Sequence, residues 1–497
     1  MMYGRQKSDL GIVALKQANK TGKPVAEPVE RRPGAKGNRV RLHTDRTQGR
    51  ATVSQRLDPV RQAARLRKQE RFTALFHYLD IDLLRESFFW LQRKSAAGVD
   101  GVMWWDYEED LENRLVDLHD RLRRGAYRAL PSRRQYIAKA DGSQRPLGIA
   151  ALEDKIVQRA VVEVLNAVYE ADFLGFSYGF RPGRCQHDAL DAVAFGIMRT
   201  PVNYILDADI EKFFDRISHD WMMQFLAHRI GDPRILRLIR KWLKAGVLED
   251  GNVTPAVMGT PQGAVISPLL ANIYLHYVFD LWVHRWRRRQ AQGNLIVVRY
   301  ADDTVIGFEH RTDAERFISE MRERLEQFGL SVHPQKTRLI EFGRQAARRR
   351  AECGLGKPET FNFLGFTHIC ARTRRGAFAL KRLTRRDRMQ AALRKIKEEL
   401  HRNRHHAIPE QGAKLRQILT GYFAYHAVPT NAEKLSAFRH HVVRTWLWAL
   451  RRRSQKDKFS WERIKRLAAY WLPSPRILHP WPDKRFAVTH PRWEPGA

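Results

Sequence analysis

A pair of adjacent aspartates between two apolar runs is the feature that most constrains this chain. Asp302 and Asp303 separate Leu295–Tyr300 from residues 304–308, and both runs are rich in β-branched and aromatic residues. This pattern predicts a β-hairpin with the carboxylates at its turn. The two charges repel each other, whereas a bound divalent cation would remove the repulsion, and oxygen ligands suit Mg²⁺. For this motif taken alone, the alternative is a solvated acidic turn.

The charge of the chain predicts a polyanionic partner. Its 497 residues include 89 Lys and Arg against 54 Asp and Glu, a net charge of +35, and such an excess suits nucleic acid or an anionic membrane surface. No apolar run is long enough to span a membrane and no signal-peptide core begins the chain, which favours nucleic acid and a cytoplasmic location. The three cysteines, Cys185, Cys353 and Cys370, lack paired spacing, so neither disulfides nor a cysteine zinc site is predicted.

Two further segments could contribute to a metal site beside the hairpin. A strand over residues 204–206 ends at carboxylates, and Asp207 and Asp209 would share one face because side chains alternate along a strand. Spacing alone leaves both as candidate ligands. Downstream, residues 259–263 (Gly-Thr-Pro-Gln-Gly) form a turn that opens a long helix reaching Arg289, and glycine there lets another group approach the backbone closely.

Two basic segments could hold phosphate groups. The run 134–149 predicts a hairpin that projects Lys139 and Arg145 from opposite strands, where the pair would suit a triphosphate; two solvated charges are the alternative. The run 176–184 mixes aromatics and glycines with Arg181 and Arg184, as in a loop that grips a nucleic-acid backbone; a packed aromatic turn is the alternative.

Helix signals organise the rest of the chain. Asp58 before Pro59 predicts an N-cap and the start of a helix, and residues 312–315 (Thr-Asp-Ala-Glu) fit a capping box. From about residue 381 the chain is helical and strongly basic, and one apolar helix ends in Arg451, Arg452 and Arg453. Cations at a helix end can merely complement its dipole, but the net charge favours a nucleic-acid-binding face.

Several short motifs occur in the order seen in one protein family. The chain resembles the reverse transcriptases of bacterial group II introns from about Phe72 to its C-terminus. The motifs are Arg145-Pro-Leu-Gly-Ile149, Ser177-Tyr-Gly-Phe-Arg-Pro182, Asp209-Ile-Glu-Lys-Phe-Phe-Asp215, Thr260-Pro-Gln-Gly263, Tyr300-Ala-Asp-Asp303, Lys336-Thr337 and Phe363-Leu-Gly-Phe366, with Gly421-Tyr-Phe-Ala-Tyr425 and Leu450-Arg-Arg-Arg-Ser-Gln455 resembling the maturase region.

The resemblance implies an α+β fold, a right-hand polymerase whose fingers and antiparallel palm sheet precede an α-helical thumb or maturase domain. We expect a basic arm over residues 1–57, an extension of the fingers over 58–130, fingers and palm over 131–380, the thumb over 381–475 and a Pro- and Trp-rich tail over 476–497. Because no Cys pairs or His-Asn-His run follow the maturase region, we expect no endonuclease module.

The resemblance also implies residue roles. Asp209 and Asp302 match the family's ligands for two Mg²⁺ ions, with Mn²⁺ as a substitute. Asp303 assists them, and Ile210 belongs to the same metal site. Phe214 matches an aromatic plate against the sugar, which leaves Phe213 as core. The remaining nucleotide-binding positions are Lys139, Arg145, Gln262, Gly263 and Lys336.

The expected function is RNA-directed DNA synthesis by two-metal-ion nucleotidyl transfer, together with binding of the intron RNA to assist splicing and mobility. The expected partners are intron or template RNA, a DNA primer, a DNA target and deoxynucleoside triphosphates, in a bacterial cytoplasmic ribonucleoprotein. Two alternatives stay open: a splicing cofactor with vestigial polymerase motifs, and a free-standing reverse transcriptase in repair or phage defence.

Overall fold

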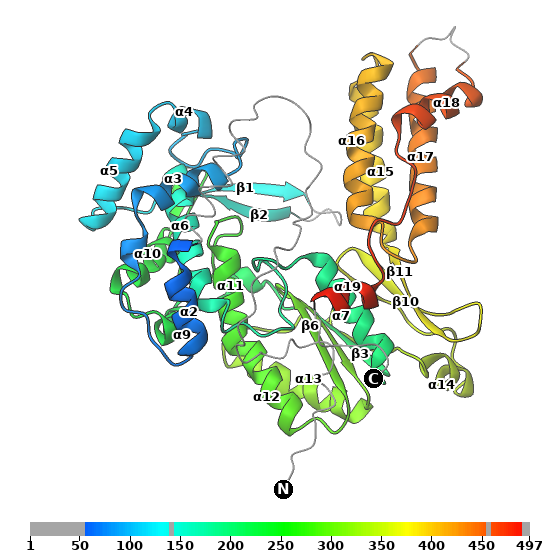
Figure 1. Ribbon diagram of the computed structural model, residues 1–497, viewed down its shortest axis with the longest axis horizontal. Coiled ribbons are helices and arrows are strands. Elements are labelled where there is room, and N and C mark those ends of the chain that lie inside the picture. The colour runs from blue at the N-terminus through cyan, green and yellow to red at the C-terminus, as the bar shows by residue number, and fades with distance from the viewer. Residues whose placement is uncertain (1–54, 139–143, 454–458, 490–497) are drawn as a thin grey trace.

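The computed structural model describes residues 55–138, 144–453 and 459–489, and combines helical regions with three β-sheets (Figure 1). Lys139, predicted to hold a triphosphate, lies outside the described residues. No helix in the described ranges is long and apolar enough to cross a membrane.

An N-terminal group of helices packs around a four-stranded sheet. The predicted hairpin is present, and β1 and β2 pair antiparallel from Arg133 opposite Ile149 to residue 138 opposite Gln144. The strand order is β2-β1-β4-β5, in which only β1 and β4 run parallel. The elements of this region are α2 (Asp58–Leu66), η1 (Phe76–Tyr78), α3 (Ile81–Trp90), α4 (Trp104–Glu108), α5 (Leu111–Arg123), β1 (Ser132–Ala138), β2 (Gln144–Ile149), α6 (Leu152–Tyr169), α9 (His219–Arg229), α10 (Pro233–Lys244), β4 (Val247–Glu249) and β5 (Asn252–Thr254).

A central antiparallel sheet with strand order β6-β7-β3-β8 carries the predicted acidic segments. Its side chains alternate between two cores: Leu206, Val297 and Ile306 enter the larger one, whereas their neighbours Ile205 and Val305 enter the other. This alternation follows from the two-residue repeat of a strand. The elements are α7 (Gln186–Arg199), β3 (Tyr204–Ala208), α8 (Phe213–Arg216), α11 (Ser267–Leu275), η2 (His276–Asp280), α12 (Leu281–Arg289), β6 (Leu295–Tyr300), β7 (Asp303–Phe308), α13 (Arg311–Glu326), β8 (Arg338–Glu341) and α14 (Ala346–Glu352).

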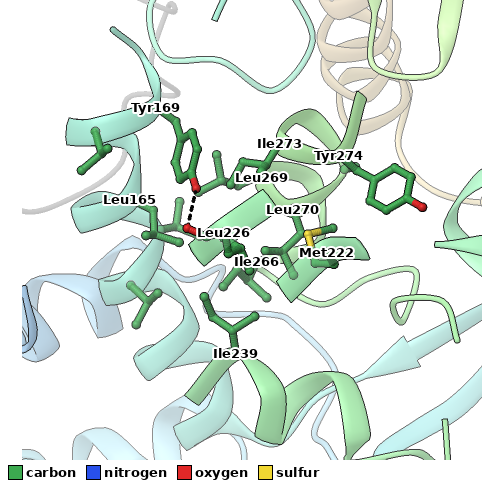
Figure 2. Packing of buried hydrophobic residues seen from close by; sticks show 14 of the residues in the cluster. Leu165, Tyr169, Met222, Leu226, Ile239, Ile266, Leu269, Leu270, Ile273 and Tyr274 are labelled. Atoms are coloured by element: carbon green, nitrogen blue, oxygen red, sulfur yellow. Dashed lines mark hydrogen bonds between the residues drawn. The ribbon is translucent and has the colours of Figure 1, made fainter. Parts of the chain in front are cut away.

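The larger core is continuous from the N-terminal helices to the central sheet. Figure 2 shows part of it, where Leu165 of α6, Leu226 of α9, Ile239 of α10 and Leu270 of α11 meet. The Tyr169 hydroxyl lies in the same core and donates a hydrogen bond to the Leu226 carbonyl at 3.4 Å, so this polar group is not left unpaired on burial (Figure 2). Shared packing of this kind fixes α11 against the elements that carry the site.

A C-terminal helical bundle stands apart with its own core (Figure 1). A small sheet, β11-β10-β9, connects it to the central sheet, and the buried Asn431 at the start of α17 accepts a hydrogen bond from the Thr384 amide at 2.9 Å. The last helix returns to α7, where Arg485 lies 3.1 Å from Asp191. The elements are β9 (Phe361–Phe363), β10 (Phe366–Arg372), β11 (Phe378–Thr384), α15 (Arg386–Arg402), α16 (Ile408–His426), α17 (Ala432–Arg451), α18 (Trp461–Trp471) and α19 (Pro482–Thr489).

Two predicted helix caps differ from the structure. Helix α2 begins at Asp58, but its N-cap is Leu57 and the Asp58 side chain caps nothing. Helix α13 begins at Arg311, so the capping box over residues 312–315 is wrong. The Asp313 side chain is buried and instead accepts hydrogen bonds from the Gln292 and Gly293 amides, at 2.9 and 3.0 Å. These donors belong to the segment before β6, which the local sequence pattern does not reveal.

Candidate active site

The two aspartates lie at the predicted hairpin turn. Strands β6 and β7 pair up to Tyr300 opposite Asp303, and Ala301 and Asp302 form the two-residue turn between them. Ala301 has a φ of +57°, a left-handed conformation that disfavours a residue with a Cβ. Such a conformation persists only when its surroundings hold it in place.

Asp209 lies beside this turn. In the pairing of β3 with β7 the last partners are Ala208 and Thr304, so Asp209 follows one residue beyond, at the end where Asp303 begins β7. The backbone of Asp209 is held from the other side, because its carbonyl accepts a hydrogen bond from the His333 amide at 2.8 Å. Ile210, the next residue, forms an isolated antiparallel bridge with Val332.

The clustered carboxylates disfavour one another's ionisation. Burial raises the pKa of Asp302, and the Asp209 charge adds to the increase, while Arg145 and Arg299 oppose it. Asp303 still contacts solvent, but its pKa is raised to about 7. The largest cause is partial desolvation by the surrounding protein, and the charges of Asp302 and Asp209 add to it. A bound cation would offset both the cost of burying these charges and the repulsion between them.

Asp207 has a different environment from Asp209, although the sequence did not separate them. Burial and the neighbouring Asp209 charge raise the pKa of Asp207 to about 6, while Arg338 opposes the increase. Asp207 is paired within the sheet, opposite Val305 and Arg338. Only Asp209 follows the end of the strand, which makes it the better placed of the two for a ligand.

Lys336 forms an ion pair with the Asp209 carboxylate. Its Nζ lies 3.1 Å from Asp209 Oδ2, and the Lys336 side chain is 64% exposed. Within the described ranges no three His, Cys, Asp or Glu side chains stand at the spacing of a ready-made metal site. The carboxylate oxygens of Asp209, Asp302 and Asp303 nevertheless fit Mg²⁺, which prefers oxygen ligands. The repulsion between these carboxylates favours a bound cation. An ion bound there would compete with the Lys336 ammonium group for Asp209.

Arg299 holds the Ala301–Asp302 turn by a hydrogen bond to the Ala301 carbonyl, a role that was not predicted from the sequence. Its side chain is fully buried and forms an ion pair with the equally buried Asp280, at 2.7 and 2.5 Å. It also donates to the Ala301 carbonyl at 2.9 Å, to Asn272 Oδ1 at 3.2 Å and to Ser177 Oγ at 2.8 Å. Asp280 ends a π-helical turn, η2, between α11 and α12, so this helical irregularity places the carboxylate under the hairpin.

A glycine in the 176–184 loop packs directly against the turn. A Cβ on Gly179 would lie 2.3 Å from the Ala301 backbone nitrogen, so only glycine permits this approach. The Gly179 carbonyl accepts a hydrogen bond from Asn272 Nδ2 at 2.7 Å, which ties the loop to the Arg299 network. Ala301 is therefore held by Gly179 of the loop and by the Arg299 side chain.

The two arginines of this loop make contacts within the protein, and their predicted role in binding nucleic acid stays a prediction. Arg181 is buried, donates to the Leu174 and Ser177 carbonyls and pairs with Glu170 at 2.9 Å. Burial lowers the pKa of Arg184, which donates to the Gly175 carbonyl at 2.5 Å. These contacts fit the packed-turn alternative.

Three predicted nucleotide-binding residues, Arg145, Gln262 and Gly263, lie on β2 and on the 259–263 turn that contacts it. Gly148, on β2 with Arg145, donates its amide to the Gln262 carbonyl at 2.7 Å. Gly263 has a φ of +112°, and a Cβ there would lie 2.9 Å from the Gly148 carbonyl oxygen. The turn over residues 259–263 therefore joins the β1–β2 hairpin to the central region, as a glycine-containing turn allows.

Phe213 and Phe214 divide as expected between core and surface. Phe213 is buried in the larger core, whereas Phe214 is only partly buried at its edge. The Phe214 carbonyl accepts a hydrogen bond from the Thr260 amide at 2.8 Å, so the backbone of Phe214 adjoins the 259–263 turn. Lys212 before them has a φ of +46°, which turns the chain sharply between Asp209 and Phe214.

The predicted cation run at the end of α17 is only partly available. Arg451 donates to the Phe459 carbonyl at 2.8 Å, and Arg453 donates to the His406 carbonyl. Arg452 is exposed and lines a hollow between α15 and α17.

Comparisons with known proteins agree with this arrangement. The family model for reverse transcriptases (RNA-dependent DNA polymerases) matches residues 137–368, the segment with the hairpin, the 259–263 turn and the acidic cluster. The chain is 35% identical to protein YkfC of Escherichia coli over 299 residues, which are 52% of this chain and 78% of YkfC.

Two further relatives are intron proteins. The chain is 37% identical over 211 residues to the group II intron-encoded protein LtrA of Lactococcus lactis, covering 42% of this chain and 35% of LtrA. It is 38% identical over 204 residues to an uncharacterized 91 kDa protein in the cob intron of Schizosaccharomyces pombe, covering 40% of this chain and 25% of the relative. The chain belongs to the group II intron reverse transcriptase and maturase family. It spans only about a third and a quarter of these two intron proteins.

Proposed function

We propose that the chain is an RNA-directed DNA polymerase that extends a primer on an RNA template. The observation that carries this proposal is the position of Asp209, one residue beyond the last β3–β7 pair and beside the Asp302–Asp303 turn. Carboxylates at adjacent strand ends, with the pKa values of Asp302 and Asp303 raised, suit a site for divalent cations. Membership of the reverse transcriptase family supports the same reaction.

Asp209, Asp302 and Asp303 would hold two Mg²⁺ ions, or Mn²⁺ in their place, with Ile210 contributing its backbone. When bound, such ions lower the pKa of a primer 3′-hydroxyl and neutralise the triphosphate and the departing pyrophosphate. Asp302 would be the indispensable ligand, because the Arg299-supported turn fixes it. Asp303 would tolerate conservative change better, since it contacts solvent.

The other residues position the incoming nucleotide. Arg145 on β2 would bind the triphosphate as a planar fork, with Lys139 as its proposed partner. Gln262 and Gly263 would line the nucleotide site, since their turn contacts β2 directly. Phe214 would face the sugar, where a 2′-hydroxyl would collide with the ring. Lys336 would exchange its contact with Asp209 for a phosphate oxygen once cations bind.

We also propose that the chain binds intron RNA in a ribonucleoprotein, assists splicing and mobility, and uses residues 381–475 as a thumb or maturase domain. The net charge of +35 supports a polyanionic partner. The separate core of α15–α18 supports a region that can move relative to the central sheet when nucleic acid binds.

The test compares native protein with Asp302→Asn in Mg²⁺-dependent primer extension on an RNA template. The variant should lose extension and keep RNA affinity, because the substitution is nearly isosteric. Val116→Thr, on the exposed face of α5, is a conservative control that lies away from the site. Normal extension by Asp302→Asn would refute the metal assignment. Splicing without any extension by the native protein would indicate the cofactor role instead.

A further inference from the structure

We propose that the hollow between α15 and α17 binds an unpaired nucleotide of an RNA. The hollow has a volume of about 220 Å³ and lies in the C-terminal bundle. We call it the α15–α17 groove. It is lined by Lys397, Leu400, His401, Arg404, His441, Arg444, Thr445, Trp448, Ala449 and Arg452.

An exposed tryptophan provides a stacking surface in the groove. Trp448 is 57% exposed, although its helix contributes the buried Trp446 and Leu450 to the bundle core. A large aromatic side chain left open beside a hollow suits a base, because every base has a π-face and stacking needs no fixed sequence. The volume is below the ~300–1,000 Å³ of sites for drug-sized ligands, which fits one ring system better than an extended ligand.

The cations around the tryptophan match the phosphates that flank a base. Lys397 and Arg404 come from the α15 side and Arg444 and Arg452 from α17, and no carboxylate lines this groove. Arg404 and Arg452 lie at helix ends, where they complement the dipoles. Lys397 and Arg444 lie more than a turn before those ends, beyond the reach of that effect, and neither forms an ion pair within the described part of the chain.

A neighbouring hollow shows that these features are not general to the bundle. It has a similar volume of about 240 Å³ but is lined by Glu399 and Glu410 together with Lys414, and no tryptophan borders it. Its mixed charges would repel a phosphate as readily as attract one. The lack of carboxylates therefore distinguishes the α15–α17 groove from this neighbouring hollow.

The groove is remote from the acidic cluster. Asn431 joins the start of α17 to Thr384 near the small sheet, and Trp448 follows 17 positions later, which is about 25 Å at 1.5 Å per helical residue. RNA recognition favours unstacked bases held on aromatic rings, and a 2′-hydroxyl could pair with His401, His441 or Thr445. The inference rests on the proposal that this chain handles RNA, but it does not require polymerase activity.

The test uses the full-length protein and an RNA hairpin with a fluorescent adenine analogue in a single-nucleotide bulge. The native protein should bind this RNA more tightly than the same hairpin with the analogue paired, and should quench its fluorescence. Trp448→Ala should abolish the quenching and weaken binding by roughly 5- to 150-fold, and Trp448→Phe should retain most of both. Lys397→Gln and Arg444→Gln should each reduce the salt slope of binding by about 1.

Trp481→Ala is the matched control, because Trp481 is also 57% exposed but lies in the segment before α19. It should bind and quench as the native protein does. Unchanged quenching and affinity in Trp448→Ala would overturn the proposal. Equal affinity for the bulged and the paired RNA hairpin would also overturn it, as would equal affinity for a bulged DNA hairpin and the bulged RNA hairpin. Primer extension separates the two proposals: Trp448-dependent quenching without extension contradicts only the polymerase, and extension without quenching contradicts only the groove.

Discussion

The buried Arg299–Asp280 ion pair should affect catalysis, although neither side chain belongs to the acidic cluster. Asp280→Asn removes the charge that compensates Arg299, and both side chains are fully buried. Removing one partner of such a pair costs about 3–5 kcal/mol, a large part of the ~5–15 kcal/mol of a typical domain. Chemical denaturation should therefore show a marked loss of stability.

The same substitution should slow primer extension. Arg299 also donates to the Ala301 carbonyl at 2.9 Å, and Ala301 has a φ of +57°. That conformation costs about 1–2 kcal/mol, so a loosened Arg299 lets the turn relax and displaces Asp302. A displacement of about 1 Å can cost ~10²-fold in rate. The rate should be measured at saturating Mg²⁺ and at a temperature where the variant is folded.

Two further variants separate positioning from folding. Asp172→Asn breaks another arginine pair, in which Arg229 is buried and Asp172 partly buried, at 2.8 Å in the N-terminal region. It should lose stability without a matching loss of rate in the folded protein. The double change Arg299→Met with Asp280→Leu should recover much of the stability, because apolar replacement of a buried pair is often neutral. It should stay slow, since methionine cannot donate to the Ala301 carbonyl; native rates in this folded double variant would refute the positioning role.

The remaining predictions concern three single sites. Gly179→Ala should destabilise the protein and slow extension, because the added Cβ would lie 2.3 Å from the Ala301 nitrogen, whereas Gly421→Ala in α16, with no atom within 4 Å, should gain up to about 1 kcal/mol in denaturation experiments. Lys336→Met should lower the Mg²⁺ concentration for half-maximal extension by up to about 5-fold, because an exposed pair is worth ~0.2–1 kcal/mol; an unchanged requirement would contradict competition for Asp209. Burial lowers the pKa of His368 to about 3, so the unfolded chain takes up a proton below pH ~6.5 and the native chain does not. Stability conferred by neutral His368 is thus present above that pH and lost as pH falls towards 3, and His368→Phe should show a smaller loss of Tm between pH 7.5 and 5.

Local patterns were enough to predict the elements that carry the acidic residues. Two apolar runs around Asp302 and Asp303 specified the β6–β7 hairpin, because strand alternation and a short link leave few other arrangements. The β1–β2 hairpin followed from the same signals. The long helix after residue 263 was also predicted, although it begins only at Ser267 and contains the π-helical turn η2.

Contacts between distant segments could not be predicted in this way. Nothing near Arg299 in the sequence identifies Asp280 as its partner, because the π-helical turn that places Asp280 leaves no distinct residue pattern. Arg181 lies in a loop whose composition suits nucleic acid, yet only the fold reveals that its guanidinium points inward. Asp313 matched a capping pattern, but the amides that it binds belong to residues 292 and 293.

The most direct test of the account is the rate of Mg²⁺-dependent primer extension on an RNA template by native protein and Asp302→Asn, with folding checked by thermal denaturation. Loss of a metal ligand removes several kcal/mol of transition-state stabilisation, so the variant should be slower by about 10³-fold or more. It should still bind the RNA template with native affinity. A folded Asp302→Asn protein that extends primers at the native rate would contradict the assignment of the Asp209, Asp302 and Asp303 cluster as the catalytic centre.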